Sequence, residues 1–212
     1  FSKKKCVMAY IYKFDLSLSE NIDFLYKKIK TEVGKVDILI NNAGIGFNGE
    51  FNEIDWQKQL DIINVNIISL SKLTKLILKD MLDQKEGRIL NVASTAAFCS
   101  GPRMAAYYAS KAYVLYLTEA IYEEYKDTGI TISCLCPGPV NTSFQGKAGI
   151  KKSKAAKRYL MDAEEVAKIC YKDFNRGRLI IIPGMKNKLL VMGNKLLPRS
   201  ISRKIILKTN RK

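Results

Sequence analysis

The chain has 212 residues, 47% apolar and 26% charged, which is typical of a globular protein with one well-buried domain. It contains no histidine, which excludes Ser-His-Asp and Cys-His catalysis and every histidine-ligated metal site. The net charge is +16, and residues 147–212 hold 19 of the 36 basic residues but 4 of the 20 acidic ones. Because histidine is absent, proton transfer would depend on a carboxylate, tyrosine, lysine or cysteine.

Strand-like and helix-like segments alternate along the chain. Short apolar runs predict strands at Cys6–Phe14, Val36–Ile40, Gly87–Ala93, Ile130–Cys136 and Leu179–Ile182. Apolar residues at helical spacing predict helices at Ser19–Val33, Asp55–Leu82, Ala105–Tyr125 and Asp162–Arg176. This alternation predicts an α/β fold, a Rossmann-like doubly wound parallel sheet with helices on both faces.

Two of these segments carry further expectations. The Val36–Ile40 run is almost continuously apolar, so we expect it to be buried on both faces of the sheet. The polar, lysine-rich stretch Asn141–Leu160 is a candidate loop or lid. Ligands of such sheets bind beyond the carboxyl ends of the strands, so the turns that follow the strands are the candidate site.

The five cysteines are odd in number and form no Cys-x-x-Cys pair, which argues against a zinc ribbon or a thioredoxin-like motif. Cys134 and Cys136 are two apart in a strand, so we expect both on one face as small buried hydrophobic residues. This cysteine usage fits a reducing, cytoplasmic setting.

Three residues that could take part in proton transfer lie at the turns after the predicted strands or on the helix behind them. Tyr107 and Lys111 are four apart on one predicted helix, so their side chains share a face. A neighbouring ammonium stabilises phenolate and would lower the tyrosine pKa toward a working value, which makes an acid/base without histidine. Ser94, at a strand end, would donate a hydrogen bond to a substrate carbonyl. Each feature alone is also compatible with a surface pair, an ordinary turn or a strand-end hydroxyl.

The order of these features resembles one family. Asn41-Asn42-Ala43-Gly44, then Ser94, then Tyr107-Tyr108-Ala109-Ser110-Lys111 and then Pro137–Thr142 follow successive strands. Together they resemble the short-chain dehydrogenase/reductase family over nearly the whole chain. The ending, from Pro183-Gly184 to Pro198-Arg199, is similar to a bacterial subgroup of largely unassigned substrate.

The resemblance implies an oxidoreductase that interconverts an alcohol and a ketone or aldehyde by hydride transfer with NAD or NADP. Tyr107 would be the proton donor and acceptor, Ser94 would orient the substrate, Lys111 would bind the ribose, and Asn66 would support a relay water. Residues implied to bind the cofactor are Asp15, Leu16, Asn42, Ala43, Gly44, Tyr107, Lys111, Pro137, Gly138, Val140 and Thr142. The alternative is a non-catalytic scaffold of the same fold.

The sequence departs from the family at its beginning. It contains no Thr-Gly-x-x-x-Gly-x-Gly turn, which in the family cradles the pyrophosphate at a helix N-terminus. We therefore expect a chain that lacks the first two strand–helix units, with a gap beside the Cys6–Phe14 strand. The segment that selects NAD or NADP is absent with them. On this reading the isolated chain is unstable and binds cofactor weakly, whereas its parent is a complete enzyme.

The expected domain organisation is one NAD(P)-binding domain over residues 1–184, incomplete at its N-terminus, and a basic amphipathic extension over 185–212. The extension has the composition of a helix that lies on anionic lipid, which would place the protein at the inner membrane face. Core packing or a subunit contact would explain the same leucines. Nucleic-acid binding is disfavoured because aromatic residues do not interleave the lysines. By resemblance, the helices Asp55–Leu82 and Ala105–Tyr125 would form a homodimer or homotetramer interface.

Overall fold

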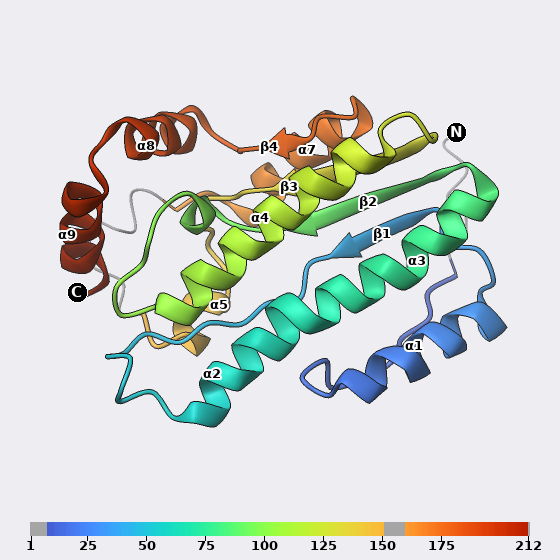
Figure 1. Ribbon diagram of the computed structural model, residues 1–212, viewed down its shortest axis with the longest axis horizontal. Coiled ribbons are helices and arrows are strands. Elements are labelled where there is room, and N and C mark those ends of the chain that lie inside the picture. Colours follow the sequence, from blue (N-terminus) through green and yellow to red (C-terminus); the bar gives the residue numbers. More distant parts are fainter. Residues whose placement is uncertain (1–7, 151–159, 212) are drawn as a thin grey trace, which may run out of the picture.

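A computed structural model describes residues 8–150 and 160–211, and its centre is a parallel sheet of four strands. The strands lie side by side in chain order: β1 (Ile38–Asn41), β2 (Gly87–Val92), β3 (Ile130–Leu135) and β4 (Ile180–Ile181). Helices α3 (Leu70–Gln84) and α4 (Ala105–Tyr125) cover one face, and α7 (Ala163–Asn175) covers the other (Figure 1). The predicted α/β fold with helices on both faces is confirmed.

The core follows the two-residue period of the central strands. Ile89 of β2 and Ile132 of β3 are fully buried toward α3 and α4. Leu90 and Leu135 point the other way, into a cluster with Phe174 of α7. Burial on both faces explains why apolar residues stand next to each other in these strands, as in Ile89-Leu90 and Cys134-Leu135, where a half-exposed strand would alternate apolar and polar residues.

Strand β1 does not meet the expectation of burial on both faces. Ile38 and Ile40 are 49% and 55% exposed, whereas Leu39 between them packs into the α3–α4 side of the core. Ile40 is in register with Leu90, so the exposed pair lies on the α7 side of the sheet. The α7 cluster extends over β2, β3 and β4 but not over β1, which leaves this face of β1 bare.

The predicted first strand, Cys6–Phe14, is wrong for its described part. Residues 8–14 have no strand structure, and Met8 and Ile11 are 76% and 92% exposed. The physical reason is pairing: a strand needs a neighbour for its backbone N–H and C=O groups, and the sheet offers this segment none. The expectation that this segment has no neighbouring strand holds for its described part, since none of the four contiguous strands pairs with residues 8–14.

The predicted helix Asp55–Leu82 is helical, but its winding changes in the middle. It consists of α2 (Trp56–Ile63), a π-helical turn η1 (Asn64–Ser69) and α3. Asp55 caps its start by accepting a hydrogen bond from the Gln57 N–H at 2.9 Å. The π turn buries Asn66, and such turns occur frequently at functional sites.

A buried chain of polar side chains joins β1 and β2 to the two helices above them. The Asn41 amide donates to Thr74 Oγ1 of α3 and to Asn91 Oδ1 of β2, both at 2.8 Å. The Asn91 amide in turn donates to Thr118 Oγ1 of α4 at 3.0 Å. Asn41 therefore belongs to the strand and not to the turn in which the sequence interpretation placed it.

The remaining elements lie around this sheet. Helix α1 (Ser19–Glu32) packs beside α3, a 3₁₀ turn η2 (Thr95–Phe98) follows β2, and a short helix α5 (Phe144–Lys147) follows β3. The predicted lid Asn141–Leu160 includes α5, and its residues 151–159 lie outside the described residues. Cys134 and Cys136 are fully buried on one face of β3 with their Sγ atoms 3.7 Å apart, as predicted.

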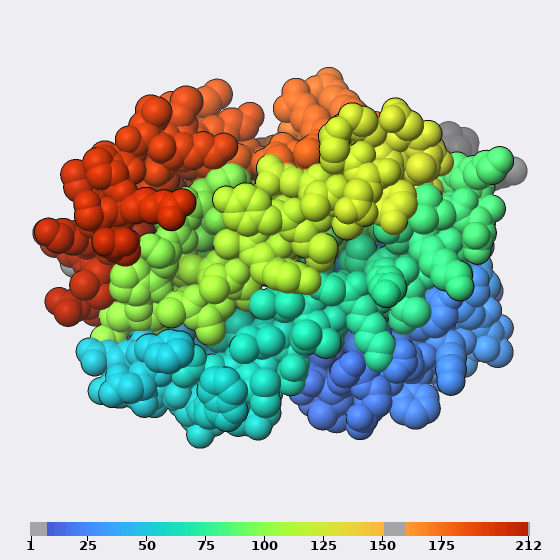
Figure 2. Space-filling model, in the orientation of Figure 1, coloured from blue at the N-terminus to red at the C-terminus, as the bar shows by residue number. Residues whose placement is uncertain are grey.

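The C-terminal extension forms two helices, α8 (Met185–Leu196) and α9 (Arg199–Asn210), and not one continuous helix. Pro198 separates them, because proline fits the start of a helix but not its interior. They form a lobe at one end of the molecule (Figure 2). None of the helices in the described part of the chain is both long and apolar enough to cross a membrane.

Candidate active site

The turn after β1 is fixed by a single side chain. Asn66 is fully buried, its Oδ1 accepts a hydrogen bond from the Ile45 N–H, and its Nδ2 donates to the Ile45 carbonyl, both at 2.9 Å. Its Nδ2 also donates to Ser110 Oγ at 2.9 Å. Asn66 therefore ties the turn to helix α4, a structural task that the sequence interpretation did not foresee.

Ser94 and Tyr107 come from different elements and meet at the carboxyl end of the sheet. Ser94 begins η2, where its Oγ accepts a hydrogen bond from the Ala96 N–H at 3.1 Å. Burial raises the pKa of Tyr107 to about 12, and a hydrogen bond with Ser94 offsets part of that rise. The phenol is therefore protonated at neutral pH.

Lys111 lies one helical turn after Tyr107 and is 4% exposed. Its Nζ donates a hydrogen bond to the Val92 carbonyl at 2.8 Å and lies 5.9 Å from the centre of the Tyr107 ring. Burial lowers the pKa of Lys111 to about 8. The sequence led us to expect that this ammonium lowers the Tyr107 pKa, but in the structure the larger effect on each residue is its own desolvation.

The loop after β3 runs close to Ser94 and is held from both sides. The Thr95 N–H donates to the Pro137 carbonyl at 2.9 Å. From the other side Asn187 of α8 packs against Gly138, where a Cβ atom would lie 2.2 Å from Asn187 Oδ1. Asn187 is 9% exposed and donates to the Pro183 carbonyl at 2.7 Å. Asn187 could not be identified from the sequence, because it lies 49 positions after Gly138.

The rest of this loop turns away from the sheet. Val140 is half-buried and pairs with Met161 in a parallel bridge. Thr142 is exposed and its Oγ1 accepts a hydrogen bond from the Phe144 N–H at 3.3 Å. Phe144 then packs on the Tyr107 ring, with 5.3 Å between the ring centres. The loop therefore connects two predicted cofactor residues to the wall beside the tyrosine.

The other predicted cofactor residues fall into two groups. Asn42 and Ala43 are exposed just beyond β1, and Gly44 lies against Lys111. Asp15 is exposed, and hydrogen bonds from Ser17 lower the pKa of its carboxyl. The Leu16 carbonyl accepts a hydrogen bond from Ser69. Asp15 and Leu16 are thus held by α1 and by η1, apart from the hydrogen-bonded group around Tyr107.

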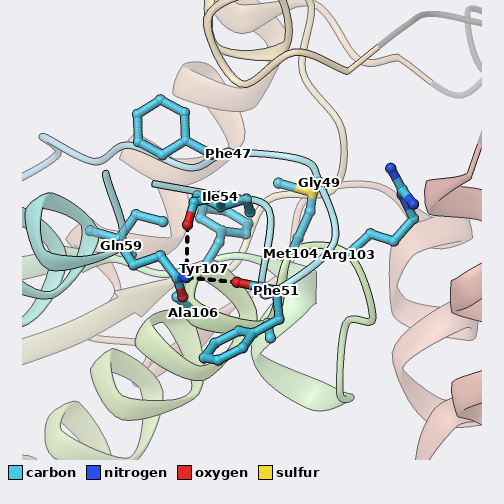
Figure 3. Close-up of a pocket in the computed structure, with 11 residues that line it drawn as sticks. Phe47, Gly49, Phe51, Ile54, Gln59, Arg103, Met104, Ala106 and Tyr107 are labelled. Atoms are coloured by element: carbon cyan, nitrogen blue, oxygen red, sulfur yellow. Dashed lines mark hydrogen bonds between the residues drawn. The ribbon is translucent and has the colours of Figure 1, made fainter. Parts of the chain in front are cut away.

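A small pocket that is partly open to solvent lies beside Tyr107, and its enclosed part has room for about one water molecule. Its walls are mostly apolar, and Gln59 closes it by donating to the Phe51 carbonyl at 2.9 Å and the Ile54 carbonyl at 3.3 Å (Figure 3). The lining residues that point into it include Phe47, Phe51, Ile54, Met104 and Tyr107. The sequence interpretation had assigned none of these walls, since their residues are ordinary apolar ones.

The nicotinamide–ribose half of NAD(P) fits the donors that are present. The Lys111 ammonium has three hydrogen-bond donors. Among the described residues, one of them is used, in the hydrogen bond to the Val92 carbonyl. The other donors could bind ribose hydroxyls. Gly44 allows the turn to approach closely, since a Cβ there would lie 3.1 Å from Lys111 Nζ. The pyrophosphate half has no glycine-rich cradle in this sequence.

Curated proteins of similar sequence include two reductases. The chain is 37% identical over 128 residues to the ketoacyl reductase HetN of Nostoc sp., covering 60% of this chain and 45% of that protein. It is 32% identical over 155 residues to the 3-oxoacyl-[acyl-carrier-protein] reductase FabG of Haemophilus influenzae, covering 70% and 64%. The chain thus spans about half to two thirds of the length of these relatives.

Solved structures show the same fold. A short-chain dehydrogenase/reductase from Burkholderia phymatum in complex with NAD superposes with a TM-score of 0.74 at 26% identity, covering 85% of this chain and 73% of that one. A short-chain dehydrogenase from Sphingobium yanoikuyae in complex with NADPH gives 0.73 at 25% identity, covering 80% and 65%. Residues 2–153 match the family described as short chain dehydrogenase. The chain therefore belongs to the short-chain dehydrogenase family.

Proposed function

We propose that this chain carries the catalytic site of an NAD(P)-dependent reductase that interconverts an alcohol and a carbonyl compound. The observation that carries the proposal is the meeting of Ser94, at the start of η2, with Tyr107 and Lys111 of α4 at the carboxyl end of one parallel sheet. NAD or NADP, when bound, supplies or accepts the hydride.

Each side chain then has a task that its surroundings support. In reduction, the Tyr107 hydroxyl gives its proton to the carbonyl oxygen, and its pKa of about 12 keeps that proton in place until the oxygen becomes basic. Ser94 holds the same oxygen by a hydrogen bond. Lys111 holds the nicotinamide ribose, and Asn66 fixes the turn that borders the site. Asn42, Ala43 and the Pro137–Thr142 loop would contact the rest of the cofactor.

The substrate class that we propose is a 3-oxoacyl thioester. HetN is a ketoacyl reductase and FabG acts on 3-oxoacyl groups of the acyl carrier protein. The apolar walls of Phe47, Phe51, Ile54 and Met104 beside Tyr107 suit an acyl chain. The lysine-rich stretch that follows α5 would suit an acidic carrier.

The test is carbonyl-dependent oxidation of NADPH and NADH by the protein expressed from its full reading frame, with 3-oxoacyl thioesters and simple ketones. Tyr107→Phe is expected to lower kcat/KM by at least about a hundredfold, because it removes the proton donor. Tyr116→Phe is the control, since Tyr116 lies on the same helix but is 67% exposed. Equal activity of the two variants, or no activity of the wild type, would favour the non-catalytic scaffold.

We further propose that the protein works as a homodimer or homotetramer through the outer faces of α2, α3 and α4. Apolar and aromatic side chains are exposed there, including Ile68 at 42% in η1, between α2 and α3, and Tyr116 at 67% on α4. Sedimentation velocity of the wild type and of Tyr116→Glu checks this, since a charge at the centre of such an interface would give monomers. A wild type that sediments as a monomer would contradict it.

A further inference from the structure

The C-terminal hairpin, which we define as α8, α9 and their connection (residues 185–211), has a one-sided charge. It contains eight basic residues and no acidic one. All eight are exposed: Lys186, Lys188, Lys195, Arg199, Arg203, Lys204, Lys208 and Arg211. Because no acidic residue of the hairpin compensates this charge, it presents a positive field to anything that approaches.

Apolar side chains of the same hairpin are exposed as well. On α8 they recur at helical spacing, which places Met185, Leu189, Met192 and Leu196 on one face, with 54–80% of each exposed. On α9, Ile201 and Ile205 are one turn apart and 46% and 52% exposed. Each helix therefore carries an apolar stripe bordered by lysine and arginine.

The opposite side of each helix is firmly packed, so this exposure is not a result of loose attachment. Asn187 and Val191 of α8 are buried, and Ser202 of α9 donates to Asn194 Oδ1 at 3.2 Å. Lys195 Nζ lies 5.6 Å from the centre of the Phe98 ring on η2. Core packing, one explanation of the hairpin leucines, is therefore wrong for the stripe residues, which this structure leaves uncovered.

We propose that the C-terminal hairpin binds the surface of a bilayer that contains anionic lipids. Such surfaces bind helices with an apolar stripe, which enters the headgroup–acyl boundary, and with basic residues beside it. Each lysine or arginine near an anionic surface strengthens binding by about fivefold. This proposal rests on the hairpin alone and does not depend on the proposed function.

Two other occupants match the hairpin less well. In a symmetric dimer the same patch faces itself, so eight positive charges would meet eight more. A nucleic acid would match the charge but not the apolar stripes, and residues 185–211 contain no aromatic side chain on which bases stack. Anionic lipid satisfies both the charge and the apolar surface.

The hairpin also contacts residues that are next in sequence to the pocket lining. Asn210, the last residue of α9, donates to the Pro102 carbonyl at 2.9 Å, and its own carbonyl accepts a hydrogen bond from the Asn48 amide at 3.0 Å. Pro102 and Asn48 are next in sequence to Arg103 and Phe47, which line the pocket. A bilayer under the hairpin would therefore lie close to the entrance of an apolar pocket.

The test is co-sedimentation of the full chain with vesicles of phosphatidylcholine alone and of phosphatidylcholine mixed with phosphatidylglycerol. The protein is expected to bind the anionic vesicles, and this binding should weaken in high salt. Binding to vesicles without phosphatidylglycerol should be at least about tenfold weaker. Lys204→Gln with Lys208→Gln is expected to weaken binding by roughly tenfold or more. Leu189→Ser with Ile205→Ser should weaken it comparably, because both side chains leave the acyl boundary.

Matched controls separate the hairpin from general effects. Lys75→Gln with Lys79→Gln removes the same charge at the same spacing from exposed positions of α3, and Phe24→Ser removes a 59% exposed apolar side chain from α1. Both are expected to bind vesicles like the wild type. The proposal is overturned if the wild type does not bind anionic vesicles, or if controls and hairpin variants lose binding equally. Self-association or DNA binding that depends on the hairpin, without vesicle binding, would assign it to those partners instead.

Discussion

Strands β1 and β2 are neighbours in one sheet and both contain adjacent apolar residues, yet their surroundings differ. β2 has helices on both faces, and its Ile89 and Leu90 are buried. β1 is covered on the α3 side alone, and its Ile38 and Ile40 are about half exposed. The difference shows that an apolar sequence allows a strand to be buried, whereas the helices packed on it determine whether it is buried. The residues that stabilise the fold most, and those of the candidate site, should therefore lie on the covered side of the sheet.

The buried polar chain on the covered side should respond most to mutation. Asn91→Ala removes one hydrogen bond from the Asn41 amide and one from the Thr118 hydroxyl, each of which keeps a second bond, and creates a cavity. These losses should lower the free energy of unfolding by about 2–3 kcal/mol. Asn42→Ala, one position beyond β1 and exposed, should change it by less than about 0.5 kcal/mol. Urea denaturation measures both, and equal effects would remove the distinction between the two sides.

Because Lys111 is buried on the covered side, the free energy of unfolding should depend on pH. Its pKa falls from its usual 10.5 to about 8 on folding, so between these values the unfolded chain binds more protons. The free energy of unfolding should therefore rise with pH from 8 to 10.5, by on the order of 2–3 kcal/mol. Above pH 10 the raised pKa of Tyr107 acts in the opposite direction.

Denaturant titrations across this pH range check the assignment, with Lys111→Met as the variant. The variant should lack the rise between pH 8 and 10, while Lys79→Met, exposed on α3, should keep it. A rise that survives in Lys111→Met would mean that another group carries it.

The contact between α8 and the loop after β3 should have a smaller effect. Gly138→Ala would bring a Cβ within 2.2 Å of Asn187 Oδ1, and Asn187→Ala would remove the hydrogen bond to Pro183. Each should destabilise the protein by about 1 kcal/mol or somewhat more. In the double variant the costs should not add, with a coupling of about 1 kcal/mol that a double-mutant cycle measures. Additive costs would show that the two residues do not press on each other.

The bare face of β1 should be the least sensitive part. Ile40→Thr keeps a β-branched side chain at a position that is 55% exposed, so the free energy of unfolding should change by less than about 0.5 kcal/mol. Ile89→Thr, at a fully buried position on β2, is the matched substitution and should cost several times more. A large cost at Ile40 would mean that this face is covered in solution.

The sequence predicted much of the fold because its signals were local. β2, β3 and α4 lie within one residue of their predicted bounds, since periodicity and turn residues define them. The bare face of β1 was not predictable, because an apolar run looks the same whether or not a helix covers it. The π turn at Asn64–Ser69 was missed because it interrupts a helix without changing the apolar spacing around it.

The candidate site was predictable to the extent that its residues form an ordered motif. Resemblance to the family brought out Ser94, Tyr107 and Lys111, and the structure brings these three together. Asn187 and Asn210 could not be found in this way, because their partners lie far along the chain. The prediction that Lys111 lowers the pKa of Tyr107 is wrong, because burial raises that pKa. The spacing of two residues in the sequence does not show how deeply either is buried.

Cofactor binding tests the central claim, a working reductase site around Tyr107, most directly. Fluorescence titration with NADH and NADPH would be carried out on the protein from its full reading frame and on its Lys111→Met variant. The account predicts saturable binding of at least one of the two, weakened about tenfold or more in the variant, because the ammonium holds the nicotinamide ribose. Wild-type protein that binds neither dinucleotide, or a variant that binds as tightly as the wild type, would contradict it.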